Sequence, residues 1–311
     1  MVQEETRFIG RSDELAAVSS LLSVGVAADR PLALISGAAG LGKTRLMDEL
    51  ARRTDRSVTR LLVGRGREEV RFPYGPIAEA LRDHAELLLE RCSAPTAAIL
   101  RGLFGSRPTR SDSRESARQR LFVAVSDALH AMSRDRPTLL MLDDLHWFDP
   151  DSLDLFEHLA FSVTHPGREA PLSLVATLRE PEAESRLARL VARLSREVRC
   201  IRVQLEGLDA GETGELVRGL GGAPAAQKLV TRLRRETGGN PLFVKEIVRD
   251  LIRAHQLEQR RGYLTATEAG REWQLPADVT AAVQRRVSRL PRACRDALAT
   301  AALIGQEFTL A

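Results

Sequence analysis

Lysine is scarce in this sequence. Three of the 311 residues are lysine, Lys43, Lys228 and Lys245, and the other 43 basic residues are arginine. Because arginine serves nearly every other need for a cation, a lysine at a particular position suggests chemistry that needs a narrow ammonium rather than a planar guanidinium. The arginines are spread along the chain and the net charge is only +4. The composition therefore permits contact with nucleic acid without arguing for it.

Cysteine is equally scarce, and long apolar runs are missing. The three cysteines are widely spaced, form no C-x-x-C pair and have no histidine at metal-ligand spacing. This pattern excludes a cysteine-based zinc site and favours a reducing compartment. No apolar run approaches the ~20 residues that cross a bilayer, and the N-terminus is acidic where a signal peptide would be basic. We therefore expect a cytoplasmic protein with no membrane partner.

The sequence does contain a complete phosphate-binding loop. Residues 37–44 fit G-x-x-x-x-G-K-[ST] at every fixed position, with an apolar stretch at 32–36 before them and a helical pattern after them. In this context backbone N–H groups and the positive end of a helix dipole converge on a phosphate. We predict that Lys43 reaches the β- and γ-phosphates of ATP and that the Thr44 hydroxyl ligates Mg²⁺. The predicted nucleotide-binding residues of this segment are Gly37, Ala38, Ala39, Gly40, Leu41, Gly42, Lys43, Thr44 and Arg45.

Another apolar stretch ends in two carboxylates. Asp143 and Asp144 follow the apolar residues 139–142. In P-loop enzymes an acid at the carboxyl end of a neighbouring parallel strand holds Mg²⁺, and we assign this role to Asp143. Asp144 is then placed to polarise the attacking water as the catalytic base. Taken alone, the pair could equally end a strand and cap a turn.

Arg179 follows a further buried strand, predicted over 172–178. In a parallel sheet its side chain would emerge beside the phosphate loop and could bind the γ-phosphate. Pairing with a surface acid explains Arg179 equally well. His146 and Trp147 come directly after the two acids, and we expect them to pack rather than to take part in catalysis.

Strand and helix patterns alternate up to about residue 204, and helical patterns follow. Alternation predicts a parallel sheet with helices on both faces, which is an α/β P-loop NTPase core over 1–206. The later helices predict a helical lid over 207–256, and a polar hairpin with two more helices occupies 257–311. The expected strands are 32–36, 60–64, 138–143, 172–178 and 200–204, and the expected helices are 43–53, 74–91, 115–133, 150–161, 209–220, 223–237, 241–255, 278–289 and 292–304.

Six motifs in a fixed order resemble the STAND-class ATPase module, related to AAA+ ATPases, of large ATP-binding LuxR-type transcriptional regulators. The motifs lie at 8–14, 37–44, 73–76, 142–149, 176–179 and 238–243. The resemblance implies that 257–311 begins a winged-helix domain, apparently truncated. It also implies that Ile9 and Arg11 lie near the adenine and that Pro241 touches the nucleotide from the lid. Leu178 departs from the pattern, since relatives often have an aromatic residue there.

The resemblance and the motifs together predict a switch that binds ATP or ADP with Mg²⁺ and hydrolyses ATP slowly. They imply self-association or a protein partner on ATP binding, and contact with DNA only through a domain outside this chain. An AAA+ DNA-remodelling or loader ATPase is the main alternative. A small-molecule kinase would need an acceptor pocket, and the intact acids and phosphate loop argue against a module that binds without turnover.

Overall fold

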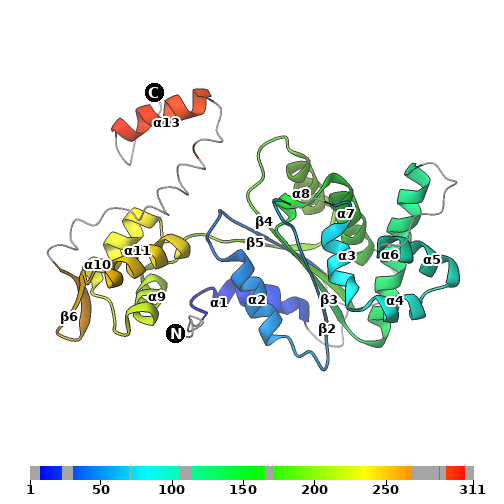
Figure 1. Cartoon of the computed structure of the whole chain (residues 1–311), viewed down its shortest axis with the longest axis horizontal. Helices are drawn as coiled ribbons and strands as arrows, with labels where there is room; N and C mark the ends of the chain where they lie inside the picture. Colours follow the sequence, from blue (N-terminus) through cyan, green and yellow to red (C-terminus); the bar gives the residue numbers. More distant parts are fainter. Residues whose placement is uncertain are drawn as a thin grey trace. The chain divides into compact units, whose positions relative to one another are not determined.

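The chain forms two compact units, Gly10–Glu206 and Met1–Ile9 with Gly207–Ala311. The structure is a computed structural model, shown in Figure 1, and it describes residues 8–22, 31–69, 72–104, 114–164, 171–267 and 292–304 together with residue 287. The first unit holds the phosphate loop and both acids, and the second is mainly helical.

Five parallel strands form the sheet of the first unit, in the order β2-β3-β4-β1-β5. The three central strands are buried along nearly their whole length, as apolar strands covered on both faces are. Because the strands are parallel and β4 lies between β1 and β3, the carboxyl ends of these three strands meet at one edge. The bounds are β1 Leu32–Ser36, β2 Arg60–Arg65, β3 Thr138–Asp143, β4 Leu172–Leu178 and β5 Cys200–Gln204.

Helices cover both faces of this sheet. Alternate strand residues such as Leu32 and Leu34 share one core with α3 to α8, whereas α1 contacts β5 and α2 contacts β3 and β4 (Figure 1). The predicted parallel α/β core is therefore confirmed. These helices are α1 Ser12–Ser19, α2 Lys43–Arg53, α3 Gly75–Arg82, α4 Ala85–Arg91, α5 Ala94–Leu103, α6 Arg114–Asp135, α7 Pro150–Val163 and α8 Arg186–Glu197, with single 3-10 turns η1 Ser20–Leu22 and η2 Leu145–Trp147.

The single helix expected over 74–91 is wrong. The chain leaves the helical path at Asp83 and His84, and α4 then packs on α5 and α6. No glycine or proline marks this break, and the packing of α4 on α5 and α6 leaves no local signal in the sequence. The helices α1, α5 and α8 were not expected either, although Ser93 and Ser185 cap the last two by accepting hydrogen bonds from backbone N–H groups.

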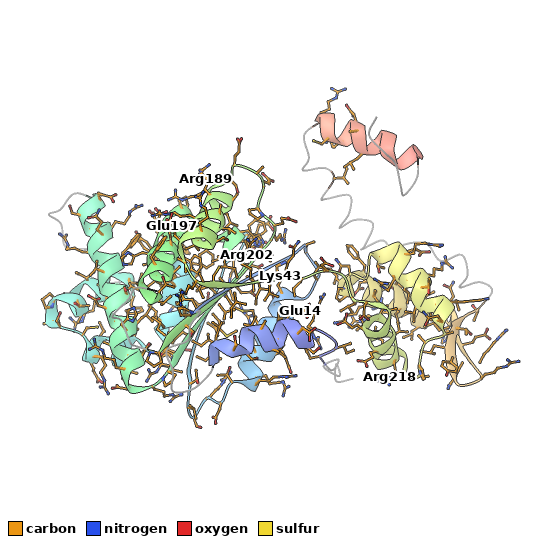
Figure 2. All side chains as sticks on the ribbon, turned by 180° about the vertical axis from the view of Figure 1, so that it is seen from behind. Glu14, Lys43, Arg189, Glu197, Arg202 and Arg218 are labelled. Carbon is orange, nitrogen blue, oxygen red and sulfur yellow. The ribbon has the colours of Figure 1, made fainter. Side chains whose placement is uncertain are left out.

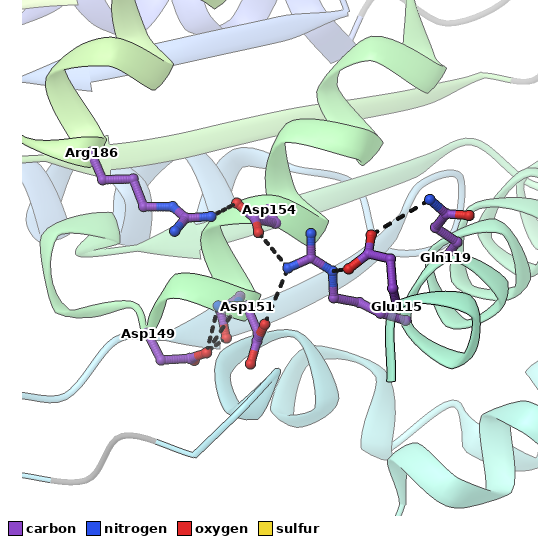
Figure 3. Close-up of polar contacts among 8 residues, drawn as sticks. Glu115, Gln119, Asp149, Asp151, Asp154 and Arg186 are labelled. Atoms are coloured by element: carbon purple, nitrogen blue, oxygen red, sulfur yellow. Dashed lines mark hydrogen bonds and ion pairs between the residues drawn. The ribbon is translucent and has the colours of Figure 1, made fainter. Parts of the chain in front are cut away.

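A network around Arg118 ties α6 to α7 and α8 (Figure 3). The Arg118 guanidinium donates to Asp154 Oδ2 at 2.8 Å and lies 3.4 Å from Asp151 Oδ1. Arg186 of α8 donates to the other oxygen of Asp154. Asp149 caps α7 by accepting from the N–H groups of its first turn. The network therefore fixes the N-terminus of the helix that begins six residues after Asp144.

The second unit packs three helices and a hairpin around one core. Leu264 of the hairpin belongs to this core, and its backbone pairs with the segment before α10 through Ala226 N–H and Pro224 C=O. This pairing explains why α10 begins at Gln227 rather than at the expected residue 223. The elements are α9 Ala210–Gly221, α10 Gln227–Thr237, α11 Pro241–Arg253, β6 Leu257–Arg260, β7 Tyr263–Ala266 and α13 Arg292–Ile304. The helix expected over 278–289, and with it most of the expected winged-helix start, lies outside the described residues.

Candidate functional site

The phosphate loop joins β1 to α2 through glycines in conformations that other residues avoid. Gly40 and Gly42 have φ of 84° and 93°, and Gly42 is the residue from which α2 starts. A Cβ on Gly37 would lie 2.9 Å from the Leu205 carbonyl oxygen. Only glycine meets both demands without strain. The loop thus has the turn into a helix N-terminus that presents N–H groups to an anion.

Lys43 is the first residue of α2, and its side chain is only 6% exposed. Figure 2 labels this side chain in the first unit. Its ammonium donates hydrogen bonds to the backbone carbonyls of Gly37 at 2.9 Å and Ala38 at 3.0 Å. The lysine therefore folds back along the loop that precedes it. The next residues, Thr44 and Arg45, lie in the same first turn, with Thr44 exposed and Arg45 half-buried.

The Thr177 side chain forms hydrogen bonds with both Asp143 and Asp144 at the end of the neighbouring strand. Asp143 is the last residue of β3 and is buried, while Asp144 has a left-handed backbone with φ of 61°. The fully buried Thr177 hydroxyl on β4 donates to Asp143 Oδ1 and accepts from the Asp144 N–H at 2.8 Å. Sequence reasoning gave Thr177 no role. Its signals were a hydroxyl near the carboxyl end of a largely apolar strand and its place in the motif at 176–179.

Gly66 supports the same turn from the β2 side. Its N–H donates to the Asp143 carbonyl at 2.8 Å, and a Cβ at this position would lie 2.5 Å from the Asp144 carbonyl oxygen. The backbone therefore approaches the acid pair more closely than any side chain allows. Gly66 was also missed, because nothing local distinguishes it from a loop glycine.

The charges that act on Asp144 come from residues that were predicted separately, namely Asp143, Lys43 and Arg179. Burial raises the pKa of Asp144 above its ordinary value, and the neighbouring Asp143 raises it further. The positive charges of Lys43, Arg179 and Arg65 act against these two effects by lowering the pKa of Asp144. A carboxylate with a raised pKa accepts a proton more readily, which suits general base chemistry.

Arg179 follows β4 and lies against the residues after the acid pair. Its guanidinium sits over the Trp147 ring, 5.4 Å from the centroid, and its backbone N–H donates to His146 Nδ1 at 3.4 Å. Burial lowers the pKa of His146 to about 3, assisted by the charges of Arg179 and Lys43. The imidazole is therefore neutral at physiological pH.

The residues assigned to the adenine by resemblance are divided between the units. Ile9 packs against the core of the helical unit, and Pro241 is the first residue of α11 in that unit. Arg11 belongs to the first unit, is 8% exposed, and its guanidinium donates to Glu14 at 2.9 Å and to the Glu206 carbonyl. Their contacts with a nucleotide stay predictions.

The glycine pair before Pro241 packs closely against the segment that enters the helical unit. A Cβ on Gly207 would lie 1.8 Å from the Gly238 carbonyl oxygen, and one on Gly239 would lie 2.3 Å from the Leu208 carbonyl oxygen. Leu208 N–H also donates to the Gly239 carbonyl at 2.8 Å. These glycines therefore serve a close approach of two backbones.

The residues at the acid pair suit a magnesium ion that is shared with phosphate. Among the described residues, no group of three or more His, Cys, Asp or Glu side chains could hold a metal ion by itself. Mg²⁺ at phosphate sites takes one or two protein oxygens and completes its shell with phosphate and water. The Thr44 hydroxyl and the Asp143 carboxylate, whose Oδ1 is oriented by Thr177, fit this requirement.

A concavity of about 470 Å³ lies apart from these residues, among α6, α7 and α8. Arg118 and Arg186 on its wall both pair with Asp154, and Arg193 pairs with Glu157 at 3.0 Å. Its charges are thus matched within the wall itself, and it lacks the excess positive charge that a phosphate site requires.

The sheet order, the glycine turn before a buried lysine and the acid pair on β3 define the class of P-loop nucleoside triphosphatases. The profile of the AAA ATPase domain matches residues 7–175. The chain belongs to this family. Residues 210–259 match a domain of unknown function, DUF8739.

An uncharacterised protein of Rhizobium meliloti (strain 1021) is 28% identical over 271 residues, which cover 77% of this chain and 24% of the relative. The chain thus spans about a quarter of that relative's length. In the described part of the chain, no helix combines the length and the apolar character needed to cross a membrane.

Three solved structures are similar to this chain at low identity. Cdc6p from Pyrobaculum aerophilum is 16% identical with a TM-score of 0.49, and 82% of this chain and 65% of that chain are covered. A Walker-type ATPase of Pyrococcus abyssi is 13% identical with a TM-score of 0.48, covering 80% and 69%. AMPPCP-bound DnaA from Aquifex aeolicus is 17% identical with a TM-score of 0.45, covering 79% and 62%.

Proposed function

We propose that this chain is the ATPase module of a STAND-class, LuxR-type transcriptional regulator, a switch that binds ATP with Mg²⁺ and hydrolyses it slowly. Membership of the AAA ATPase domain family and the ordered motifs support the proposal. The observation that carries it is the environment of Asp144, which lies in the field of both Lys43 and Arg179 beside a second carboxylate.

Lys43 would bind the β- and γ-phosphates. Its ammonium donates to two neutral carbonyls of the loop, and phosphate oxygens are stronger, charged acceptors for the same N–H groups. The loop backbone and the N-terminus of α2 add N–H donors to the same anion. ATP binding therefore exchanges carbonyl partners of Lys43 for phosphate partners.

Asp143 and Thr44 would hold Mg²⁺, which when bound neutralises charge on the β- and γ-phosphates. Asp144 would orient the attacking water and accept its proton, a role that its raised pKa favours. Arg179 would leave the Trp147 ring to bind the γ-phosphate. The guanidinium can do so because a ring contact at 5.4 Å is weaker than a charge-assisted bond to phosphate.

The output of such a switch is conformational. Loss of the γ-phosphate would remove partners of Lys43 and Arg179, and self-association or binding of a protein partner would follow the nucleotide state. Contact with DNA would be made by a domain outside this chain. Contacts of Ile9, Arg11 and Pro241 with the nucleotide stay predictions that the family resemblance implies.

Replacing Lys43 with alanine tests the proposal. Lys43→Ala should abolish ATP binding in calorimetry with Mg²⁺, while its circular dichroism stays that of the wild type. Lys228→Ala is the matched control, because Lys228 is an exposed lysine on α10. The proposal fails when Lys43→Ala binds ATP within a few-fold of the wild type, or when the wild type itself does not bind.

The alternative of a DNA-remodelling or loader ATPase is compatible with the same family. A loader should assemble into rings with a non-hydrolysable ATP analogue and should bind duplex DNA through this chain. A regulator module should change its conformation or pair with itself without DNA. Sedimentation velocity with the analogue, in the presence and absence of a DNA duplex, distinguishes the two functions.

A further inference from the structure

His146 lies between the two residues that would act on the γ-phosphate and on the attacking water. It is the middle residue of the turn η2 and its side chain is only 12% exposed. Its Nδ1 is 3.4 Å from the backbone nitrogen of Arg179 and 3.6 Å from Asp144 Oδ1. One ring nitrogen therefore connects the end of β4 with the turn after β3.

The two neighbours of Nδ1 require different protonation of this nitrogen. The Arg179 N–H is a donor and needs the Nδ1 lone pair, whereas the Asp144 carboxylate is an acceptor and needs a hydrogen on Nδ1. A neutral imidazole can satisfy one of them at a time. Because the two distances differ by only a few tenths of an ångström, a small movement of Arg179 together with a change of tautomer is enough to change the partner.

The other ring nitrogen does not anchor the histidine. Nε2 is buried and has no hydrogen-bond partner among the described residues. A buried imidazole with one unsatisfied nitrogen is costly, and a phenylalanine or leucine would fill the same space without that cost. The polar atom that matters is therefore Nδ1, between Arg179 and Asp144.

Arg179 is loosely held on its side of this contact. Its guanidinium rests over Trp147, and the Trp147 ring lies 4.9 Å from the His146 ring. Movement of the guanidinium toward a phosphate would pull on the Arg179 backbone and thus on the N–H that Nδ1 accepts. The γ-phosphate is the only part of ATP that ADP lacks, so it provides the differential contact that selects a state.

We propose that His146 is a positioning residue that couples γ-phosphate binding by Arg179 to the orientation of Asp144. This inference rests on the proposed ATPase function. Without the γ-phosphate, Nδ1 accepts from the Arg179 N–H and Nε2 carries the hydrogen. With it, the Arg179 N–H withdraws, and the other neutral tautomer, which carries its single ring hydrogen on Nδ1 instead of Nε2, is favoured because Nδ1–H can donate to Asp144. The imidazole is neutral in both states.

Nitrogen NMR of protein labelled with ¹⁵N-histidine reads the tautomer directly. The His146 signals are identified by their loss in His146→Asn. We expect an unprotonated Nδ1 with Mg²⁺ and ADP, and a protonated Nδ1 with Mg²⁺ and a non-hydrolysable ATP analogue. The same tautomer in both complexes overturns the inference and leaves the proposed function intact. Absence of nucleotide binding in calorimetry overturns the proposed function and the inference with it.

Kinetics provide an independent test. His146→Phe fills the space but removes Nδ1, and it should lower kcat about ten-fold with KM within two-fold, as loss of an outer-shell partner does at metal sites. His146→Asn keeps a polar atom near the Nδ1 position and should recover most of kcat. In an Asp144→Asn background, His146→Phe should have no further effect, because the carboxylate that it positions is gone.

The control for burial is His130→Phe. His130 is also a buried histidine, 5% exposed, and its Nε2 lies 3.2 Å from Ser162 Oγ between α6 and α7. This variant should lose stability and keep kcat. An unchanged kcat in His146→Phe, or equal losses of kcat in the two phenylalanine variants, would overturn the positioning role. Should His146→Phe fail to fold, a ten-fold loss in His146→Asn also contradicts it.

Discussion

Replacing Thr177 with valine exchanges one hydroxyl for a methyl group of similar size. Valine has nearly the same shape and suits a buried strand, so no cavity or backbone change is expected. The hydroxyl holds the acid pair from both sides, by donating to Asp143 Oδ1 and by accepting from the Asp144 N–H. Thr177→Val therefore separates this hydrogen bonding from packing.

The expected cost follows from the groups left without a partner. A hydrogen bond to a charged group contributes about 1.5–3 kcal/mol, and an unsatisfied buried N–H costs about 1–3 kcal/mol. Both effects come from one hydroxyl and do not add fully, so we expect the free energy of unfolding of the first unit to fall by about 2 kcal/mol. We also expect kcat for ATP hydrolysis to fall, because the left-handed turn at Asp144 loses one of its supports.

Urea denaturation followed by Trp147 fluorescence measures the stability of this unit, with Trp273 replaced by phenylalanine. Thr213→Val is the matched control, followed by circular dichroism. Thr213 is fully buried in α9, and its hydroxyl has no hydrogen-bond partner among the described residues. The control should be neutral or stabilising. A loss below about 0.5 kcal/mol in Thr177→Val together with an unchanged kcat would refute the role of the hydroxyl.

Three further predictions concern the same unit. Asp144→Asn should keep ATP affinity and lower kcat at least about 100-fold, whereas Asp143→Asn should weaken Mg²⁺-dependent binding in calorimetry; identical behaviour of the two variants contradicts the division of roles. Gly66→Ala should displace the Asp144 carbonyl and slow ATP hydrolysis. It should also lower the free energy of unfolding, measured in thermal melts, by about 1–3 kcal/mol. A wild-type kcat would show that the turn tolerates the methyl group. The hydrogen bond from Arg52 lowers the pKa of Glu49 from 4.5 to about 2, so ionised Glu49 stabilises the fold above pH 4.5 and this contribution is lost as the pH falls toward 2. Glu49→Gln should thus lower the free energy of unfolding by about 1 kcal/mol at pH 7, a value discounted because the arginine is exposed. Urea titrations at pH 4 and pH 3 should show a progressively smaller loss. A loss independent of pH would exclude the ion pair as its source.

Features encoded in short segments were predictable from the sequence. The strand, glycine turn and helix of the phosphate loop lie within residues 32–53, and each part has a local signature. The alternation of strands and helices likewise predicts a parallel sheet, because parallel strands need crossover connections. The alternation does not predict that β4 lies between β1 and β3. Strand order depends on pairing between segments that are distant in the sequence.

Features created by distant segments were not predictable. Thr177 lies more than thirty residues after the acids that it holds, and Gly66 reaches the same turn from β2. Neither contact leaves a periodic pattern, and the motif at 176–179 contains Thr177 without indicating which residues its hydroxyl contacts. The same reason explains the late start of α10, where residues 224–226 pair with Leu264 instead of extending the helix. The roles of Ile9 and Pro241 at a nucleotide stay predictions.

The backbone at Asp144 also limits which acid this turn can carry. Its φ of 61° lies in the left-handed region, which asparagine, aspartate and glycine adopt more readily than residues with longer side chains do. A glutamate would therefore pay for the backbone and would also carry its carboxylate one methylene further out, past a turn that Thr177 and Gly66 already fix on both sides. Asparagine and glycine are the replacements that we expect to keep this turn and remove the charge. Loss of the base therefore does not require loss of the fold.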